Sequence, residues 1–301
     1  MLLSVENMII RRRIGDKAAV DLLKEAGFTG IDYSLCGMED WDAVAGSKNA
    51  LSYAEDLRRY AEDRGIVFSQ SHAPFTFKYG MEKSTDNPHF FSIIQAMEFA
   101  SHLGCPMIVV HGILVPEGED VFAYNLDYYQ RLLPYAEKYG ILIAVENLTG
   151  RSGRHTQPTT RLFGSPEAFC HIQDLLDSPW ICGCLDLGHA NMTFHDVPGF
   201  IRGSKGHFRY VHIHDNDGLQ DLHELPVLNE SDDLIIHWDE ALAALREVGY
   251  DGAMNLELVR YMKRFPTEHL PCAMRLAALT GQMMIEEFTD PRPGRFGKKI
   301  R

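Results

Sequence analysis

Imidazole and carboxylate side chains recur in this sequence at the points where short apolar runs end. A polar side chain next to a buried run is costly unless it is hydrogen-bonded or binds a metal ion. One such residue is more often a satisfied core or capping residue than a ligand, but a series at six successive run ends indicates a metal site. Imidazoles and carboxylates without cysteine suit Mn²⁺, Zn²⁺, Co²⁺ or Fe²⁺ better than a structural zinc site built from thiolates. The candidate ligands are His72, His111, Glu146, Asp186, His189, His212, His214, Asp221, His223 and Glu257.

Two of these histidines compete for one role. His212 and His214 alternate with Val211 and Ile213, so both imidazoles face the same side of the predicted strand. We expect one of them to be a metal ligand and the other to contact the substrate or to support a ligand through a hydrogen bond. The sequence leaves open which of the two is the ligand.

The apolar runs alternate with longer segments of helical periodicity, which predicts repeated strand–helix units. Gly27 and Gly140 are typical helix ends, and Ser165-Pro166 is a typical helix start. The predicted strands cover 2–5, 30–35, 66–74, 107–112, 141–147, 181–189, 208–215 and 252–258. The predicted helices cover 15–27, 51–64, 90–103, 121–139, a segment from 165, the region near 198–203, 238–248 and 269–288.

Eight such units over about 290 residues predict an α/β protein with a single (β/α)8 TIM barrel at 1–290. The alternative, a doubly wound open sheet, would need a glycine-rich phosphate loop after the first strand, and 6–16 contains none. In a barrel the carboxyl ends of the strands meet at one rim, where the candidate ligands would converge. The last segment, 291–301, holds five basic residues and little apolar content, and is predicted to be a solvated basic tail.

The composition is that of an ordinary globular chain, with 45% hydrophobic and 24% charged residues. The formal charge of −13 argues against a protein whose main task is to bind phosphate backbones, so we do not expect nucleic acid as a partner. No apolar run reaches the ~20 residues that span a bilayer, and the first residues lack a secretory cleavage pattern. The six cysteines are scattered and predict no disulfide framework, which is typical of a cytoplasmic protein.

The residues at the run ends form a series of short motifs. In order these are SHAP (His72), VVHG (His111), VENL (Glu146), CLDLGH (Asp186, His189), HIHD (His212, Asp215), DLH (Asp221, His223) and NLEL (Glu257). The series resembles the xylose isomerase-like TIM-barrel superfamily, which includes sugar isomerases and epimerases, inosose dehydratases and endonuclease IV. The resemblance covers essentially the whole chain. It departs after His223, where ELPVLNESDDLIIHWDEA stands in place of the family's usual glycine-rich stretch, so the substrate is not specified.

The resemblance implies different metal sites in different branches. In the epimerase branch one divalent ion, often Mn²⁺, would be held by Glu146, Asp186, His212 or His214, and Glu257. In the endonuclease IV branch three ions would be held, with the further ligands His72, His111, His189, Asp221 and His223. This chain has both sets of residues, so the resemblance implies one to three ions.

The function that follows is the isomerisation or epimerisation of a sugar, a sugar phosphate or a related polyol through an enediolate. Glu146 and Glu257 would stand three strands apart on the ring, where they can act as acid and base on opposite faces of the substrate. His189 would hold a substrate oxygen, and Phe75 and Arg151 are further candidates for contact with the substrate. A small carbohydrate is the expected partner, and a homo-oligomer is compatible with the sequence.

Other classes of protein are compatible with the same residues. A hydrolase of the endonuclease IV type would hold a second ion at His72 and His111 and a third at Asp221 and His223, and would activate water for attack on phosphorus. A lyase or dehydratase would use the same enediolate chemistry, and a barrel without activity would only bind a sugar or a partner. The number of ions per chain separates the first two classes, because one ion favours the epimerase and two or three favour the hydrolase.

Overall fold

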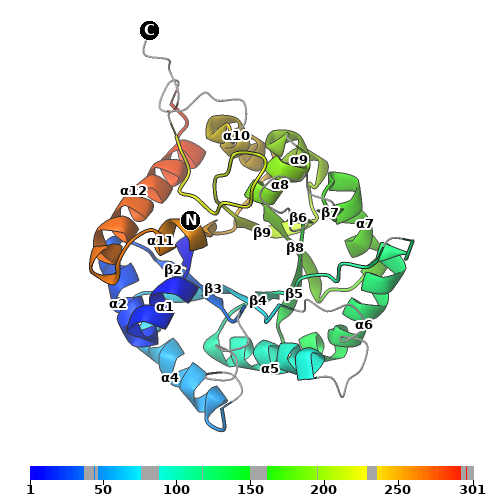
Figure 1. Ribbon diagram of the computed structural model, residues 1–301, viewed down its shortest axis with the longest axis horizontal. Coiled ribbons are helices and arrows are strands. Elements are labelled where there is room, and N and C mark those ends of the chain that lie inside the picture. Colours follow the sequence, from blue (N-terminus) through cyan, green and yellow to red (C-terminus); the bar gives the residue numbers. More distant parts are fainter. Residues whose placement is uncertain are drawn as a thin grey trace.

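The computed structural model describes residues 1–36, 44, 47–75, 88–116, 118–149, 161–194, 196–228, 236–292 and 296, without the side chains of 88, 89 and 161. These residues form a ring of strands surrounded by helices (Figure 1). None of the helices in this part of the chain is long and apolar enough to cross a membrane.

The ring consists of eight strands that pair in the order β10-β1-β2-β3-β4-β5-β8-β9, and every pair is parallel. It closes between β9 and β10, where Ile213 N donates to Asn255 O at 2.8 Å and Glu257 N donates to Ile213 O at 3.0 Å. This closure confirms the predicted (β/α)8 barrel and excludes the open sheet. The strands are β1 (Leu3–Glu6), β2 (Gly30–Ser34), β3 (Val67–His72), β4 (Met107–Val109), β5 (Leu142–Glu146), β8 (Ile181–Asp186), β9 (Phe208–His212) and β10 (Met254–Leu256).

The helices form the outer layer because each presents an apolar face to the strands. Two of them begin at side-chain caps, where Asp120 accepts from Phe122 N and Ala123 N, and Ser165 accepts from Ala168 N. The α-helices are α1 (Met8–Ile14), α2 (Asp16–Ala26), α4 (Ala50–Glu62), α5 (Pro88–Leu103), α6 (Val121–Tyr139), α7 (Pro166–Leu176), α8 (Leu187–Thr193), α9 (Val197–Gly203), α10 (Trp238–Val248), α11 (Val259–Lys263) and α12 (Leu270–Thr289). A 3₁₀ helix (Thr267–His269) precedes α12, and β6 (Leu148–Thr149) pairs with β7 (Arg161–Leu162) as an antiparallel ribbon.

Alternation along the strands separates an outer core from the interior of the ring. On β2, Ile31 and Tyr33 belong to the large core between strands and helices, whereas Asp32 between them bonds to residues of β3 and β10. A smaller apolar cluster of Met107, Val109, Ala144, Cys182 and Cys184 lies apart from that core. The polar side chains at the strand ends therefore stand on a packed base and not over an open channel.

The sixth predicted strand is shorter than expected. β8 ends at Asp186, not at 189, because the Asp186 carboxylate accepts a hydrogen bond from His189 N at 2.6 Å and caps α8. His189 is consequently carried by a helix and not by a strand. The sequence also does not predict α1 and α11, since both are short and begin without a side-chain cap.

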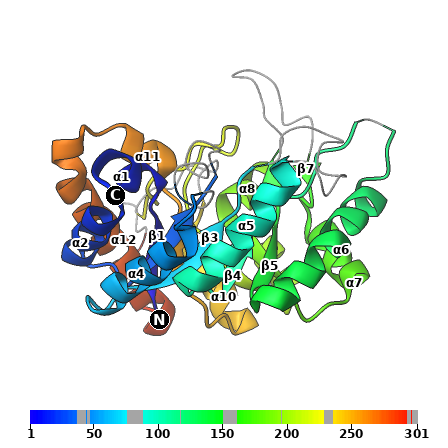
Figure 2. The same cartoon turned by 90° about the horizontal axis from the view of Figure 1, so that it is seen from below.

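The carboxyl ends of the strands open on one end of the barrel, which we call the mouth. In Figure 2 the N-terminus lies at the lower end, and the segment that follows β9 rises at the upper end. Asp215 anchors this segment to the start of α10, because its carboxylate accepts hydrogen bonds from Val227 N at 3.0 Å and from Trp238 Nε1 at 2.9 Å.

Of the predicted basic tail the structure describes Pro291, Arg292 and Phe296. Phe296 is buried against the large core, while Pro291 and Arg292 are exposed. A solvated tail over the whole of 291–301 stays a prediction.

Candidate metal centre

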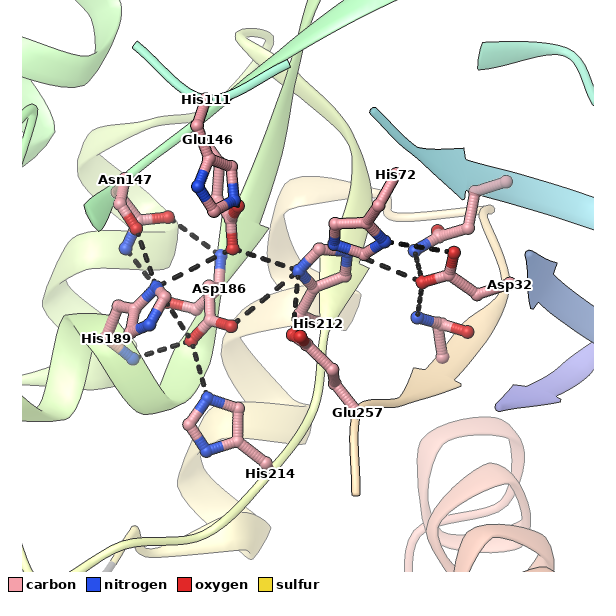
Figure 3. Close-up of polar contacts among 12 residues, drawn as sticks. Asp32, His72, His111, Glu146, Asn147, Asp186, His189, His212, His214 and Glu257 are labelled. Atoms are coloured by element: carbon pink, nitrogen blue, oxygen red, sulfur yellow. Dashed lines mark hydrogen bonds and ion pairs between the residues drawn. The ribbon is translucent and has the colours of Figure 1, made fainter. Parts of the chain in front are cut away.

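The candidate ligands predicted from the sequence lie together at the mouth, and Figure 3 shows most of them around His212. Together with Asp32, their possible ligand atoms fall into four groups, in each of which all atoms lie within 4.8 Å of one another. Three of them we call the central group (Glu146, Asp186, His212, Glu257), the early group (His72, His111, Glu146) and the late group (His189, His214, Asp221, His223). The fourth group, Asp32, His72 and His212, shares one histidine with the early group and one with the central group.

The central group surrounds one nitrogen atom. His212 Nδ1 lies 3.0 Å from Glu146 Oε1, 3.1 Å from Glu257 Oε2 and 3.7 Å from Asp186 Oδ2. All four side chains are buried. They come from the ends of β5, β8 and β9 and from the residue directly after β10, so four neighbouring strands bring them together.

The donors of the central group fit a divalent cation. His212 Nδ1 carries at most one proton, yet it faces three carboxylates, and one proton cannot satisfy all of them. Asp186 Oδ2 and Glu257 Oε2 are buried and accept no hydrogen bond from the described residues. Buried anionic oxygens of this kind are costly unless a cation pairs with them. Three carboxylates and an imidazole are suitable ligands for Mn²⁺, Zn²⁺, Co²⁺ or Fe²⁺.

The early group shares Glu146 with the central group. While Glu146 Oε1 faces His212, Glu146 Oε2 lies 2.7 Å from His111 Nε2. His72 completes the group, and its ring stacks on that of His212 with the centroids 4.7 Å apart. The Phe75 ring stacks on His111 at 4.4 Å, so this predicted substrate contact lies directly beside the early group.

The late group collects around Asp221. Asp221 Oδ1 lies 3.0 Å from His223 Nε2, 3.5 Å from His189 Nε2 and 3.9 Å from His214 Nε2. His214 also faces Asp186 Oδ1 at 3.1 Å, and its ring stacks on His223 at 4.1 Å. The structure places the two histidines in different groups, since His212 belongs to the central group and His214 to the late group.

Hydrogen bonds on the far side of three histidines orient their rings. His189 Nδ1 lies 2.9 Å from Asn147 O, and His223 Nδ1 lies 3.2 Å from Glu257 O. Because a carbonyl oxygen can only accept, each Nδ1 carries the proton and each Nε2 is left facing the group. His72 Nδ1 is anchored in the same way by Asp32 Oδ1 at 3.1 Å. Metal-binding histidines are held by contacts of this kind.

The charges in the mouth stabilise one another. Burial alone would raise the pKa of Glu146, but His111 and His212 hold that pKa well below its ordinary range. Burial also opposes ionisation of Glu257, yet His223 and His212 lower its pKa to about 2. Burial lowers the pKa of His212, whereas Cys184, Glu257 and Glu146 outweigh it and raise that pKa well above its ordinary range. The carboxylates are therefore anionic at neutral pH, and a bound cation would take the place of the protons on their histidine partners.

Asn147 fixes the relative position of two candidate ligands. Its side-chain amide donates to Asp186 O at 2.9 Å and accepts from Asp186 N at 2.7 Å. Asp186 in turn caps α8 and so places His189, which bonds to the Asn147 carbonyl. Glu146 and Asp186 are thus held by adjacent residues of a single hydrogen-bonded unit between β5 and α8.

Two buried acids of the mouth, Asp32 and Glu6, were not predicted from the sequence. Asp32 is fully buried and bonds to His72, and Glu6 is buried at the end of β1 with Oε2 accepting no hydrogen bond from the described residues. An acid inside an apolar run was the available signal, since Glu6 follows Val5 and Asp32 follows Ile31. Arg151, which the sequence placed near the substrate, lies outside the described residues.

Comparisons with known proteins support the same fold. A family model described as a xylose isomerase-like TIM barrel matches residues 20–273. The chain is 29% identical to the 2-oxo-tetronate isomerase of Pectobacterium atrosepticum over 179 aligned residues. The aligned region covers 58% of this chain and 62% of the isomerase. Its fold is similar to a crystal structure of a D-tagatose 3-epimerase-like protein, with a TM-score of 0.69, 22% identity and coverage of 96% and 97%. It is also similar to the IOLI protein with a binding zinc atom, with a TM-score of 0.67, 18% identity and coverage of 96% and 98%.

Proposed function

Because the chain belongs to the xylose isomerase-like TIM barrel family, we propose that it is a divalent-metal-dependent enzyme that isomerises or epimerises a sugar, a sugar phosphate or a related polyol. The observation that carries this proposal is the central group, in which three buried carboxylates converge on His212 Nδ1. The names of two similar proteins, a 2-oxo-tetronate isomerase and a D-tagatose 3-epimerase-like protein, support a substrate of the sugar or sugar-acid class.

The central group would hold the divalent ion, with Glu146, Asp186, His212 and Glu257 as ligands. Such an ion stabilises the negative charge that develops on a substrate carbonyl oxygen when the neighbouring C–H proton is removed. The similar IOLI protein is described with a binding zinc atom, which supports a divalent metal in a barrel of this fold, and Mn²⁺, Co²⁺ and Fe²⁺ suit the same donors.

Glu146 and Glu257 are the proposed acid and base. They come from β5 and from the end of β10, three strands apart on the ring, and both contact His212 Nδ1 from their own side. A substrate bound between them would have one glutamate on each face. One glutamate would take the proton next to the carbonyl to give an enediolate, and the other would return a proton to the opposite face, which inverts that carbon.

We propose that residues next to the central group contact the substrate. His189 Nε2 faces the mouth because its Nδ1 is bound to a carbonyl, so Nε2 can hold a substrate oxygen. His214 lies beside Asp186 of the central group, and the Phe75 ring stacks on His111 of the early group, so both adjoin the proposed metal site. Arg151 stays a candidate from the sequence alone.

Single substitutions test the acid–base assignment. We expect Glu146→Gln and Glu257→Gln each to abolish conversion in a panel of ketoses and short keto-sugar acids, with and without phosphate, because the amide cannot take up the proton. Incorporation of solvent deuterium at the reacting carbon, followed by NMR, measures proton removal directly. Glu287→Gln, which changes a buried glutamate of α12, is the matched control and should keep full turnover. Near-wild-type conversion in either site variant would overturn the mechanism, whereas exchange without conversion is expected in the variant that keeps the glutamate that removes the proton.

A multinuclear phosphodiesterase is a second candidate, and the early and late groups favour it specifically. Their seven residues would offer two further ion sites beside the central group, one at His72, His111 and Glu146 and the other at His189, His214, Asp221 and His223. Elemental analysis of the protein as isolated separates the candidates: one ion per chain supports the isomerase, and three ions together with cleavage of an abasic-site duplex would replace it by the hydrolase. The formal charge of −13 favours the small substrate.

A further inference from the structure

Asp32 lies next to His72 of the early group and His212 of the central group, and no role for it was predicted from the sequence. It is fully buried in the middle of β2. Its Oδ2 accepts hydrogen bonds from Gln70 Nε2 at 2.9 Å and from Asn255 Nδ2 at 3.1 Å, and its Oδ1 accepts from His72 Nδ1 at 3.1 Å. Side chains from β3 and β10 therefore hold this carboxylate in one orientation (Figure 3).

The same carboxylate faces a second candidate ligand. His212 Nε2 lies 3.9 Å from Asp32 Oδ2, on the side of the ring away from the three carboxylates that face Nδ1. The His72 and His212 rings are stacked with an angle of 28° between their planes, so one anion serves two adjacent imidazoles. In the described part of the chain, the ion pairs of Asp32 are with these two histidines.

The orientation of the two amides around Asp32 costs free energy, because it leaves buried amide oxygens without hydrogen bonds. Gln70 Oε1 and Asn255 Oδ1 are buried and accept no hydrogen bond from the described residues. Both amides have their N–H groups turned toward Asp32, which leaves these two oxygens unused. The Asp32 carboxylate is thus surrounded by hydrogen-bond donors, next to one histidine of the early group and one of the central group.

We propose that Asp32 is a positioning residue of the metal centre, which anchors His72 through Nδ1 and attracts the far nitrogen of His212. This inference rests on the proposed metal site and names a residue outside the central and early groups. The hydrogen bond to Asp32 places the proton of His72 on Nδ1, so that Nε2 can bind an ion. The negative charge of Asp32 also makes both imidazoles more basic and hence stronger metal ligands.

The late group supplies an internal comparison. Its histidines His189 and His223 are anchored by backbone carbonyls, and Asp32 contacts neither of them. A change at Asp32 should therefore weaken ions held by the central and early groups, and leave an ion at the late group unaffected.

The test is the affinity of the full-length protein for Co²⁺, which also reports ligand geometry through its visible absorption. Asp32→Asn removes the charge and keeps the shape, and rotation of Gln70 or Asn255 can pair the new N–H₂ group with an unused amide oxygen. We expect the first Co²⁺ ion to bind about 10- to 100-fold more weakly than in the wild type, with an altered absorption spectrum. The matched control is Ser69→Ala, which removes a buried hydroxyl that bonds to Ser4 Oγ at 2.6 Å and to Ile31 O at 3.2 Å. It keeps the Asp32 carboxylate and its partners and should leave affinity and spectrum unchanged.

The outcomes distinguish this inference from the proposed function. If the wild type binds no Co²⁺, the proposed metal site is wrong. If the wild type binds Co²⁺ and Asp32→Asn matches it in affinity and spectrum, the role of Asp32 is wrong although the metal site stands. A second measurement needs no folded variant at Asp32: in ¹⁵N-histidine NMR of the Zn²⁺-loaded wild type, we expect the proton of His72 on Nδ1, and coordination through Nδ1 would overturn the proposal.

Discussion

At the scale of single residues, Glu146 is notable because each of its two carboxylate oxygens contacts a different histidine of the mouth. Its two oxygens face different histidines, with Oε1 at 3.0 Å from His212 and Oε2 at 2.7 Å from His111. It is thus the one glutamate that belongs to both the central and the early group among the described residues. A carboxylate can bridge two cations in this way, whereas Glu257 faces the central group and the neighbouring His223.

Glu6 allows a prediction about pH at the same scale. Burial, with the nearby charges of Asp32 and Glu257, raises its pKa from 4.5 to about 7. The folded protein therefore holds a proton on Glu6 that the unfolded chain releases above pH 4.5. The resulting stability is fully present below pH 4.5 and is lost as the pH rises through about 7.

Glu6→Gln should remove this loss, because the amide stays neutral and its oxygen can still accept from Met8 N. In chelator, we expect the unfolding free energy of the variant, relative to the wild type, to rise by about 3 kcal/mol between pH 5 and pH 8. Urea unfolding at both pH values measures the difference. Parallel pH profiles for the two proteins would show that Glu6 has an ordinary pKa.

At the scale of elements, the junction between β5 and α8 is held by the Asn147 amide. Asn147→Leu would leave both the N–H and the C=O of Asp186 buried without their partners. We expect a loss of about 2–4 kcal/mol in unfolding free energy, measured by urea unfolding. Asn49→Ala, at an exposed position before α4 with no side-chain cap bond, is the control and should change stability by less than about 0.5 kcal/mol. A loss of stability for Asn147→Leu as small as that of the control would contradict the proposed role of the Asn147 amide in holding β5 and α8 together.

The close approach of α8 to β9 gives a second prediction for elements. A Cβ added at Gly188 would lie 2.0 Å from His214 Cε1, so the ring of His214 could not keep its place. Gly188→Ala should destabilise the protein by about 1–3 kcal/mol and weaken metal binding at the late group, while the central group keeps its ligands. Calorimetric titration with Zn²⁺ resolves the two effects. Unchanged titration would show that His214 is not a ligand.

At the scale of the whole molecule, the mouth concentrates negative charge that the fold must tolerate. The carboxylates that it gathers are Glu6, Asp32, Glu146, Asp186, Asp221 and Glu257, and their partners in the described ion pairs of the mouth are histidines. A divalent ion would bind the folded barrel and not the unfolded chain, because only the closed ring brings four strand ends together. Metal binding at the proposed site would therefore be linked to folding.

Removal of metal should lower the stability of the whole barrel. An ion at 100 times its dissociation constant adds about 2.7 kcal/mol, so we expect chelator to lower the Tm of the wild type by several degrees and added Mn²⁺ or Zn²⁺ to restore it. Differential scanning calorimetry measures the shift. Glu257→Gln should show a smaller shift, and an equal response of the two proteins would place the stabilising ion elsewhere.

The sequence by itself determined the barrel and the residue types of the site. Period-two and helical patterns repeat eight times, and parallel strands of a closed barrel put their carboxyl ends at one rim, so His72, His111, Glu146 and Asp186 were predictable as neighbours. The family followed from the same motifs. A cytoplasmic location and a homo-oligomeric state stay predictions from the sequence.

Only the tertiary structure decided how these side chains divide into groups. His212 and His214 are equivalent by alternation, and their different partners come from β5 and β10 on one side and from α8 and the segment after β9 on the other. Asp32 was hidden for a related reason, because its three hydrogen-bond partners lie 38 to 223 residues away in the sequence. The local sequence pattern predicts which face of a strand a side chain occupies. Its contacts depend on closure of the ring, because closure brings distant segments of the chain together.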